Sequence, residues 1–281
     1  MFSVIIPWCD RDELRVALKI NELFFSRDDV EVVVINAGGD VQALRAIVSA
    51  ANLSKAAIVD LPSSFNRSLC VNIGAHVCSG DFLFILDADI TMRTNLFDEA
   101  RPMLEAGGFV APARIVESNP AQVVKARGGE TWKFLSEFVT TQELHTLDGR
   151  YAQLRRRTSP QGDLRTGDGI IMIRRDHFVS VRGMNARLAG WGYEDTDLQL
   201  RVQFLLGVPR FEIGEVVHLT HDSSGRDQKS LQANFRVCME NYRLGHYLGS
   251  IEDDVKTYGH LLSVARLDSA AGEYQACDLK S

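Results

Sequence analysis

The stretch FLFILDADI, residues 82–90, decides the fold of this chain. Five apolar residues are followed at once by Asp87 and Asp89, so the pattern predicts a short buried strand that ends in two carboxylates. Residues two apart in an extended chain point to the same side. Paired carboxylates suit hard divalent ions such as Mg²⁺ or Mn²⁺, which bridge diphosphate oxygens. A lone D-x-D is also typical of a solvated strand end, so the surrounding sequence has to decide.

The sequence before this stretch alternates β-branched runs with helical patterns. Runs at 4–6, 30–35 and 56–59 are separated by helical stretches at 12–25, 41–51 and 65–77. Strands and helices that alternate in this way predict an α/β fold, with a mostly parallel central sheet and helices on both faces. Ligands of such sheets bind at the carboxyl ends of the strands. The residues that follow the strands are therefore the candidates for a site.

The composition limits the classes of function. The 281 residues are 45% hydrophobic, and 31 Lys and Arg stand against 37 Asp and Glu, a net charge of −6. This charge excludes the broad basic surface that collects nucleic acid. No apolar run approaches the roughly 20 residues of a membrane span, and the N-terminus lacks the pattern of a signal peptide. We expect a cytoplasmic protein. Peripheral membrane association and the oligomeric state stay open.

The five cysteines show no zinc-like spacing, and we expect buried thiols. For the domain organisation we expect a single domain over 1–250 and a C-terminal tail over 251–281. We expect residues 1–115 and 167–250 to form the two halves of this domain. Between them, 116–166 reads as an insertion or mobile loop, because it is polar and contains glycine.

A second group of candidates lies in GWGYEDTD, residues 190–197, which leads into a helical pattern. Acidic residues at a helix start are often caps, and Asp197 and Arg201, four apart, have the spacing of an ion pair. Capping does not explain Trp191 between two glycines. An aromatic face beside carboxylates, Glu194 and Asp195 among them, suits a wall that binds sugar.

Two histidines, His218 and His221, follow at the end of a predicted strand over 215–219. A lone histidine at such a place is usually structural. A pair three residues apart, in a chain that already offers Asp87 and Asp89, indicates metal ligands. His221 lies beyond the strand end and is the better candidate of the two.

The chain resembles a family 2-type inverting glycosyltransferase with the GT-A-type nucleotide-diphospho-sugar transferase fold. Its second half is similar to the β-1,4-galactosyltransferase and chondroitin polymerase group. The resemblance rests on five stretches that occur in the family's order: VIIPWCDRDEL (4–14), FNRSLCVNIGA (65–75), FLFILDADI (82–90), GDGIIMIRRDHFVSVRGMNARLAGWGYEDTDLQLR (167–201) and HLTH (218–221).

The resemblance implies a role for each matching position. On the donor side, it implies that 1–115 form the nucleotide-binding half, in which Pro7 and Trp8 form the nucleotide pocket and Arg11 contacts phosphate or base. Phe65 and Arg67 contact uracil, with Asn72 in support from the helix. Asp87 contacts ribose or diphosphate. It implies in the same way that 167–250 form the half for the acceptor and the metal. Asp89 ligates a divalent cation, Mn²⁺ or Mg²⁺, with His221 and with His218 as a further candidate. On the sugar and acceptor side, Trp191, Gly192, Tyr193 and Asp197 line the site, Glu194 binds sugar hydroxyls and Asp195 is the general base.

Three positions depart from the family pattern. Asn36 stands where an acidic residue usually follows the second strand, so its base or ribose contact is weakened or supplied by Asp40. Cys9 replaces an arginine of the galactosyltransferases, and Tyr193 replaces the second glycine of their G-W-G-G. The donor sugar is therefore not transferable from the resemblance.

We expect a metal-dependent inverting enzyme that moves a hexose or N-acetylhexosamine from a nucleotide-sugar, with UDP favoured, to a glycan or other hydroxyl acceptor. Two alternatives stay open. A degenerate member of the same fold would only bind nucleotide or glycan, and Asn36 is the feature that favours it. A sugar nucleotidyltransferase would need a glycine-rich phosphate loop after the first strand, and Pro7-Trp8-Cys9-Asp10 contains no glycine.

Overall fold

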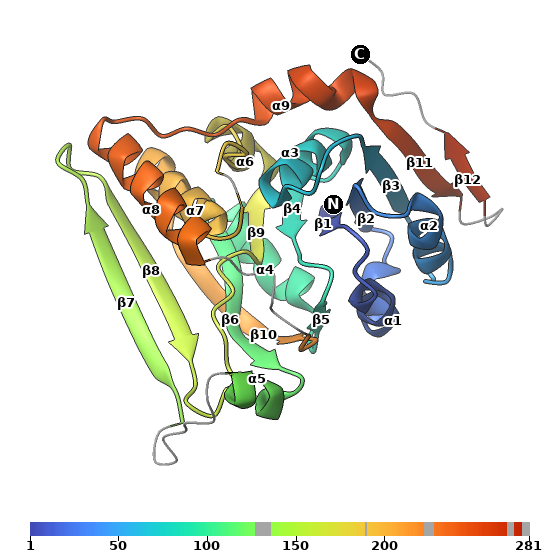
Figure 1. Cartoon of the computed structure of the whole chain (residues 1–281), viewed down its shortest axis with the longest axis horizontal. Coiled ribbons are helices and arrows are strands. Elements are labelled where there is room, and N and C mark those ends of the chain that lie inside the picture. Colours follow the sequence, from blue (N-terminus) through green and yellow to red (C-terminus); the bar gives the residue numbers. More distant parts are fainter. Residues whose placement is uncertain (127–135, 189, 222–227, 269–272, 277–281) are drawn as a thin grey trace.

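The computed structural model describes residues 1–126, 136–188, 190–221, 228–268 and 273–276. A ten-stranded sheet forms the centre of this described part, in the order β12-β11-β3-β2-β1-β4-β9-β6-β10-β5 (Figure 1). Its strands are β1 (Phe2–Trp8), β2 (Val30–Ala37), β3 (Ala56–Leu61), β4 (Phe82–Ile85), β5 (Ile90–Met92), β6 (Phe109–Glu117), β9 (Ile171–Arg174), β10 (Arg210–His218), β11 (Ser263–Asp268) and β12 (Glu273–Ala276).

The expected α/β fold is confirmed, and the sheet is mixed. Strands β3, β2, β1 and β4 run parallel, as do β6 and β10. The short strand β9 lies between these two groups and is antiparallel to both neighbours. Two antiparallel steps restore the direction, so β6 and β10 point the same way as β1 and β4. The carboxyl ends of both parallel groups therefore meet at one edge, where ligands of α/β sheets bind.

Helices cover both faces of the sheet. The helices are α1 (Glu13–Phe25), α2 (Val41–Ser49), α3 (Arg67–Val77), α4 (Leu96–Glu105), α5 (Pro120–Ala126), α6 (Arg175–Ser180), α7 (Glu194–Leu206), α8 (Gln228–Arg243) and α9 (Ile251–Tyr258), with a short 3₁₀ turn η1 (Gly259–Leu261). Neighbouring residues of β1 show how the two faces are built, since Ile6 joins the core with α1, α2 and α4 while Ile5 joins the core with α3, α6 and α7. This alternation follows from the period of two along a strand.

A separate hairpin, β7 (Phe138–His145) and β8 (Tyr151–Thr158), occupies part of the segment expected to be an insertion or mobile loop. Figure 1 places it beside α7 and α8, at the opposite end of the molecule from β11 and β12. Only Ala152 and Leu154 are buried on β8, where they pack against Leu200 and Phe204 of α7. Two buried residues are too weak a pattern to predict a strand. Residues 127–135 of the expected loop lie outside the described residues.

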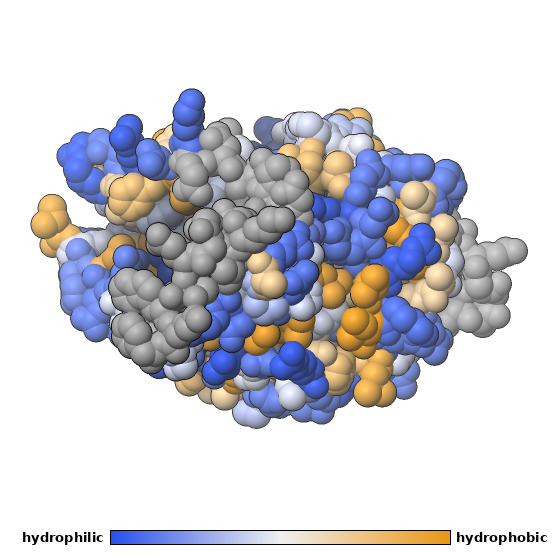
Figure 2. Space-filling view, turned by 60° about the horizontal axis from the view of Figure 1, so that its bottom comes forward, coloured by the Kyte–Doolittle hydropathy of each residue, from blue (hydrophilic) through white to orange (hydrophobic). Residues whose placement is uncertain are grey.

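The segment after residue 250, expected to be a tail, forms α9 and then β11, which pairs with β3 at the edge of the sheet. The expected tail residues 269–272 and 277–281 lie outside the described part. None of the described helices combines the length and apolarity needed to cross a membrane. Figure 2 shows small hydrophobic areas among hydrophilic ones on one face. Helix α1 carries three exposed hydrophobic residues, Val16, Ile20 and Leu23.

Candidate active site

Strand pairing builds a cluster of potential metal ligands. Strand β5 begins at Ile90 and lies antiparallel to β10, with Ile90 opposite His218. The amide of Leu219 donates a hydrogen bond to the carbonyl of Asp89 over 2.8 Å. Asp89, which is 129 positions before His218, thus lies next to both histidines. One ligand atom from each of Asp89, His218 and His221 falls within 4.8 Å of the others.

The chemistry of this cluster fits a divalent cation. Asp89 Oδ2 lies 2.9 Å from His221 Nε2 and 3.4 Å from His218 Nε2. The other oxygen, Asp89 Oδ1, is buried and has no hydrogen-bond partner among the described residues. Burial raises the pKa of Asp89, but hydrogen bonds from His218 and His221 outweigh it and hold that pKa well below its usual range. A carboxylate and two imidazoles form a mixed oxygen and nitrogen set that suits an ion such as Mn²⁺.

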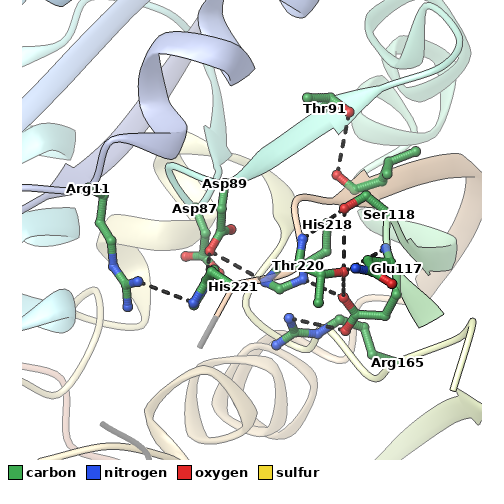
Figure 3. A network of polar contacts seen from close by, with 12 residues as sticks. Arg11, Asp87, Asp89, Thr91, Glu117, Ser118, Arg165, His218, Thr220 and His221 are labelled. Atoms are coloured by element: carbon green, nitrogen blue, oxygen red, sulfur yellow. Dashed lines mark hydrogen bonds and ion pairs between the residues drawn. The ribbon is translucent and has the colours of Figure 1, made fainter. Parts of the chain in front are cut away.

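Arg11 approaches this cluster from the end of β1. Its Nη1 lies 3.2 Å from His221 Nδ1. A guanidinium can only donate, so Nδ1 accepts and the proton of His221 lies on Nε2, facing Asp89. A bound cation would take the place of this proton. Figure 3 shows His221 in contact with both Arg11 and Asp89, with His218 and Glu117 on the other side of the cluster.

A cavity of about 580 Å³ opens beside the cluster. It brings together several of the residues predicted to hold the donor, from the ends of β1 and β4 and the start of α3, namely Pro7, Arg11, Phe65, Arg67, Asp87 and Asp89. Phe65 is 49% exposed, so its ring is open to a stacking partner. Arg67 Nε pairs with Asp87 Oδ1 over 2.9 Å. Its buried Nη1 has no hydrogen-bond partner in the part of the chain that the structure describes.

Three residues predicted for the nucleotide pocket serve the scaffold instead, and none of them lines the two cavities. Trp8 is 2% exposed, packs in the core and donates from Nε1 to the carbonyl of Arg11. Asn36 is buried and donates to Gly39 and Asp60, which holds the turn after β2. Asn72 is buried in α3.

Asn72 and Asp40 also make contacts within the protein. The amide of Asn72 donates to the carbonyl of Met184 and to Asp254 Oδ2, which ties α3 to α9. Asp40, considered as a substitute for Asn36, accepts from the amides of Gln42 and Ala43 as the N-cap of α2. The predictions that Trp8 and Asn36 contact the nucleotide are therefore corrected, because their side chains point into the protein. Asn72, predicted to support Phe65 and Arg67 from the helix, contacts Met184 and Asp254 instead.

A second cavity of about 1250 Å³ adjoins the first and shares with it Arg67, Asp87, Arg165, Gly167, Trp191, Glu194, His218 and His221. Its walls come from the hairpin β7–β8, from α8 and from the start of α7. Trp191, 37% exposed, Gly192 and Tyr193 line it together. These residues were predicted for the sugar and acceptor site, and the structure places all three beside Glu194 and Asp195.

The backbone before α7 has an unusual conformation. Gly190, Gly192 and Tyr193 all have positive φ angles, of 73°, 102° and 75°. Residues other than glycine rarely adopt this conformation, so Tyr193 occupies a position that favours glycine. The ring of Tyr193 packs edge-on against Phe235 at 5.3 Å between centroids. The bend turns Glu194 into the shared part of the cavities and Asp195 into the larger cavity.

Asp195 has the environment of a general base. Its Oδ1 accepts from the amide of Thr196 over 2.7 Å. Burial first, and then the charges of Glu194 and Asp168, raise the pKa of Asp195 to about 7, while Arg67 lowers it. A carboxylate with a pKa near the working pH is suited to proton transfer. Glu194 Oε2 is buried and makes no hydrogen bond to a described residue, so it is placed to accept from a ligand.

Asp197, predicted as an acceptor contact, is 2% exposed and lines neither cavity. Its Oδ2 pairs with Arg201 Nε over 2.8 Å, and Tyr242 Oη donates to Oδ1 over 2.7 Å. The spacing of four residues also predicted an ion pair between Asp197 and Arg201, and this interpretation is correct. Asp197 points away from Asp195 because the two residues differ by about 200° around the helix.

Sequence reasoning did not identify four charged residues of this site. Glu117 Oε2 lies 2.7 Å from His218 Nδ1. Asp168 Oδ2 accepts from Arg156 Nε over 2.8 Å and from Thr196 over 3.1 Å. Arg165 lines both cavities. No local pattern marks these residues, because each acquires its partner only when the hairpin and β6 pack beside α7 and β10.

Comparison with known proteins agrees with this architecture. The glycosyl transferase family 2 model matches residues 3–161, more than half of the chain, and a model described as N-terminal domain of galactosyltransferase matches residues 160–222. Human chondroitin sulfate N-acetylgalactosaminyltransferase 2 is 23% identical over 292 residues, which cover 97% of this chain and 50% of that protein. The chain thus spans half the length of this relative.

Solved structures share the fold. GalNAc-T7, solved with UDP, GalNAc and Mn²⁺, has a TM-score of 0.58 at 12% identity, over 92% of this chain and 56% of that one. Residues 1–349 of TarS from S. aureus give 0.54 at 14% identity, over 96% and 68%. A mannosyltransferase from Pyrobaculum calidifontis, in complex with GDP-Man and Mn²⁺, gives 0.50 at 14% identity, over 88% and 62%. The sheet, the site at its carboxyl edge and the family match lead to one conclusion: this chain belongs to glycosyl transferase family 2 and is a glycosyltransferase with the GT-A fold.

Proposed function

We propose that this glycosyltransferase takes a nucleotide-diphosphate sugar, with UDP as the favoured nucleotide, and transfers its hexose or N-acetylhexosamine to a hydroxyl of a glycan acceptor. One observation carries the proposal. The ligand cluster of Asp89, His218 and His221 lies where two cavities share a wall, and Asp195 lines the larger cavity on the other side of that wall. Donor and acceptor thus have separate spaces that meet at the reacting atoms.

In the donor cavity, Phe65 offers a ring to the base, and Arg11 and Arg67 offer guanidinium groups to the diphosphate. Asp89, His218 and His221 would hold a divalent cation, which supplies charge neutralisation at the departing diphosphate. Glu194 accepts hydrogen bonds from the hydroxyls of the transferred sugar, beside the ring of Trp191. These contacts fix the anomeric carbon at the junction of the two cavities.

In the acceptor cavity, Asp195 removes the proton of the attacking hydroxyl. The hydroxyl oxygen forms a bond to the anomeric carbon on the face opposite the leaving diphosphate, and the bond to the diphosphate oxygen breaks. The product therefore has the inverted configuration. Preorganised charges at the leaving group and a positioned base both act where charge develops in the transition state.

The names of related proteins support the donor class. GalNAc-T7 was solved with UDP, GalNAc and Mn²⁺, and the curated relative is an N-acetylgalactosaminyltransferase. The family match favours a transferase over the sugar nucleotidyltransferase alternative. The degenerate binding protein remains the competing proposal. Two observations favour an active enzyme over this alternative: the three potential metal ligands lie together, and the pKa of Asp195 is raised. Asn36, the residue that favoured the alternative, holds the turn after β2 instead.

A panel of nucleotide-sugars tests the proposal directly. UDP-, GDP-, CDP- and dTDP-linked sugars are incubated with Mn²⁺ and a set of glycan acceptors, and the anomeric configuration of the product is determined by NMR. We expect transfer from a UDP-sugar with inversion. Binding of UDP without turnover of any donor would support the degenerate alternative, and a retained configuration would exclude the proposed role of Asp195.

The base itself is tested by Asp195→Asn. Because the base acts chiefly in the transition state, we expect kcat to fall by roughly 10² to 10⁴ with nearly unchanged donor affinity. Asp195 lies in the first turn of α7, and the carbonyl oxygen of an Asn side chain can still accept from the amide of Thr196, so the melting temperature should stay close to that of the wild type. The matched control is Asp176→Asn, an exposed acid on α6. A folded Asp195→Asn variant with full activity would reduce Asp195 to a helix cap.

A further inference from the structure

Glu117 contacts His218 on the side of the ring that faces away from Asp89, and it is not one of the three proposed metal ligands. It is the last residue of β6, and the parallel pairing of β6 and β10 sets it opposite His218. Its side chain is 7% exposed. Glu117 Oε2 lies 2.7 Å from His218 Nδ1, as Figure 3 shows. The contact is therefore short, buried and fixed by the register of two strands.

This contact decides which nitrogen of His218 carries the proton. A carboxylate can only accept, so Nδ1 of His218 must donate to Glu117. Nε2 is then the nitrogen left for a cation. In the metal-free protein it faces Asp89 Oδ2 at 3.4 Å and can hold a second proton there, which a cation would displace. Histidines that ligate metals almost always donate their other nitrogen to a carboxylate, carbonyl or water, which fixes both the tautomer and the plane of the ring.

Glu117 is itself held in place. Thr220 Oγ1 donates to the same Oε2 over 2.8 Å, and Arg165 Nη1 lies 3.6 Å from Oε1. The backbone amide of Glu117 donates to the carbonyl of Asp163 over 2.9 Å. Each carboxylate oxygen thus has a neighbour, so the side chain cannot rotate without loss of these contacts.

We propose that Glu117 is a positioning residue of the metal centre. It holds His218 in the tautomer and orientation that present Nε2 to a divalent cation, before the cation binds. This inference rests on the proposed function, which makes His218 a ligand. This role of Glu117 means that β6 contributes to the metal centre as well as to the sheet. It also explains why a carboxylate is buried at the end of that strand.

The first test is the affinity of the metal-free full chain for Mn²⁺ alone, measured by calorimetry and by the EPR signal of free Mn²⁺. Glu117→Gln keeps the shape of the side chain, but an amide both donates and accepts, so it no longer selects one tautomer. We expect the Kd for Mn²⁺ to rise by roughly 10- to 100-fold. The control is Glu215→Gln, which removes the same charge from a carboxylate of β10 that pairs with Arg114. An unchanged Kd in Glu117→Gln would overturn the inference.

Arg165 could produce the same loss for another reason, because Glu117→Gln removes the carboxylate that offsets its charge. A double-mutant cycle separates the two effects. If the double variant Glu117→Gln, Arg165→Gln binds Mn²⁺ as tightly as Arg165→Gln alone, the effect is one of charge balance and positioning is overturned. A loss of roughly 10-fold or more that persists in the Arg165→Gln background supports positioning.

A second readout needs no metal. Histidine labelled with ¹⁵N reports the tautomer of His218 in the metal-free protein, and we expect Nδ1–H in the wild type and a mixture in Glu117→Gln. Should that variant fail to fold, Glu117→Asp keeps the charge but shortens the side chain by one methylene, which draws the carboxylate away from Nδ1 of His218. Wild-type tautomer and Mn²⁺ affinity in Glu117→Asp would then overturn the inference. A wild-type chain that binds no Mn²⁺ would instead refute the metal site, and the proton would still be found on Nδ1.

Discussion

Charged groups surround Asp195, the proposed base. Glu194 is its neighbour on α7, Asp168 faces it from the loop before β9, and Arg67 faces it from α3. Gly169 permits this crowding, since a Cβ there would lie 2.6 Å from Arg67 Nη2 and 3.1 Å from Asp195 Oδ2. Burial and the two acids prevail over Arg67, so the pKa of Asp195 rises to about 7.

This raised pKa predicts a pH dependence of kcat. The base works only when it is deprotonated, so kcat, measured with saturating donor and metal, should rise with pH and reach half its maximum near pH 7. Glu194→Gln removes one of the charges that raise the pKa of Asp195, so the midpoint should move to lower pH by roughly one unit. The effect of Glu194→Gln on KM is measured separately. A midpoint that does not move in Glu194→Gln would contradict the electrostatic explanation.

Tyr193 combines backbone strain with a half-buried ring. Its φ of 75° is costly for a residue with a Cβ. We expect Tyr193→Gly to be more stable than Tyr193→Ala by roughly 0.5–1 kcal/mol, because both lose the contact with Phe235 but only glycine relieves the strain. Denaturant unfolding of the two variants measures the difference. The reverse order of stability would mean that the left-handed conformation carries no cost here.

One side chain of the hairpin β7–β8 reaches the start of α7, where the proposed base lies. Arg156 of β8 donates to Asp168 Oδ2 from Nε and to Thr196 Oγ1 from Nη2, over 2.8 and 3.0 Å. Its neighbour Arg155 lies on the other face of the strand, 3.5 Å from Glu212. Because side chains alternate along β8, the adjacent residues Arg155 and Arg156 contact different partners on opposite faces of the strand.

This difference supplies a matched pair of variants. Arg156→Gln leaves the charge of Asp168 without its partner, which should raise the pKa of Asp195 by about one unit. The rise of kcat then moves to higher pH, and activity at pH 7 falls roughly 3- to 10-fold. Arg155→Gln should leave the pH profile unchanged. Equal profiles for the two variants would show that the hairpin does not act on Asp195.

The chain as a whole carries a net charge of −6, and its ligand cluster is centred on a carboxylate. A diphosphate added to this edge of the sheet needs positive charge beyond Arg11 and Arg67. We therefore expect UDP binding to require a divalent cation. Calorimetry with UDP after EDTA treatment should show loss of binding, and added Mn²⁺ should restore it in the wild type but not in Asp89→Ala. Undiminished UDP affinity without metal would refute this expectation.

The amino-acid sequence alone determined the class of the fold and the kinds of residue at its site. Strands and helices of the first half have strong local patterns, and strands β1 to β4 and helices α1 to α3 lie within a few residues of where the periodicity predicts them. Asp89, His218 and His221 could be chosen because polar residues directly after buried strands come together at the carboxyl edge of an α/β sheet.

Tertiary structure decided which of the candidate side chains face a ligand. Trp8, Asn36, Asn72 and Asp197 fit a functional pattern, yet each points into the protein, because the direction of a side chain depends on what packs against its strand or helix. Glu117, Arg156 and Asp168 have no local signal at all. Their partners lie on strands and helices distant in sequence, so their roles exist only after β6 pairs with β10 and the hairpin packs on α7.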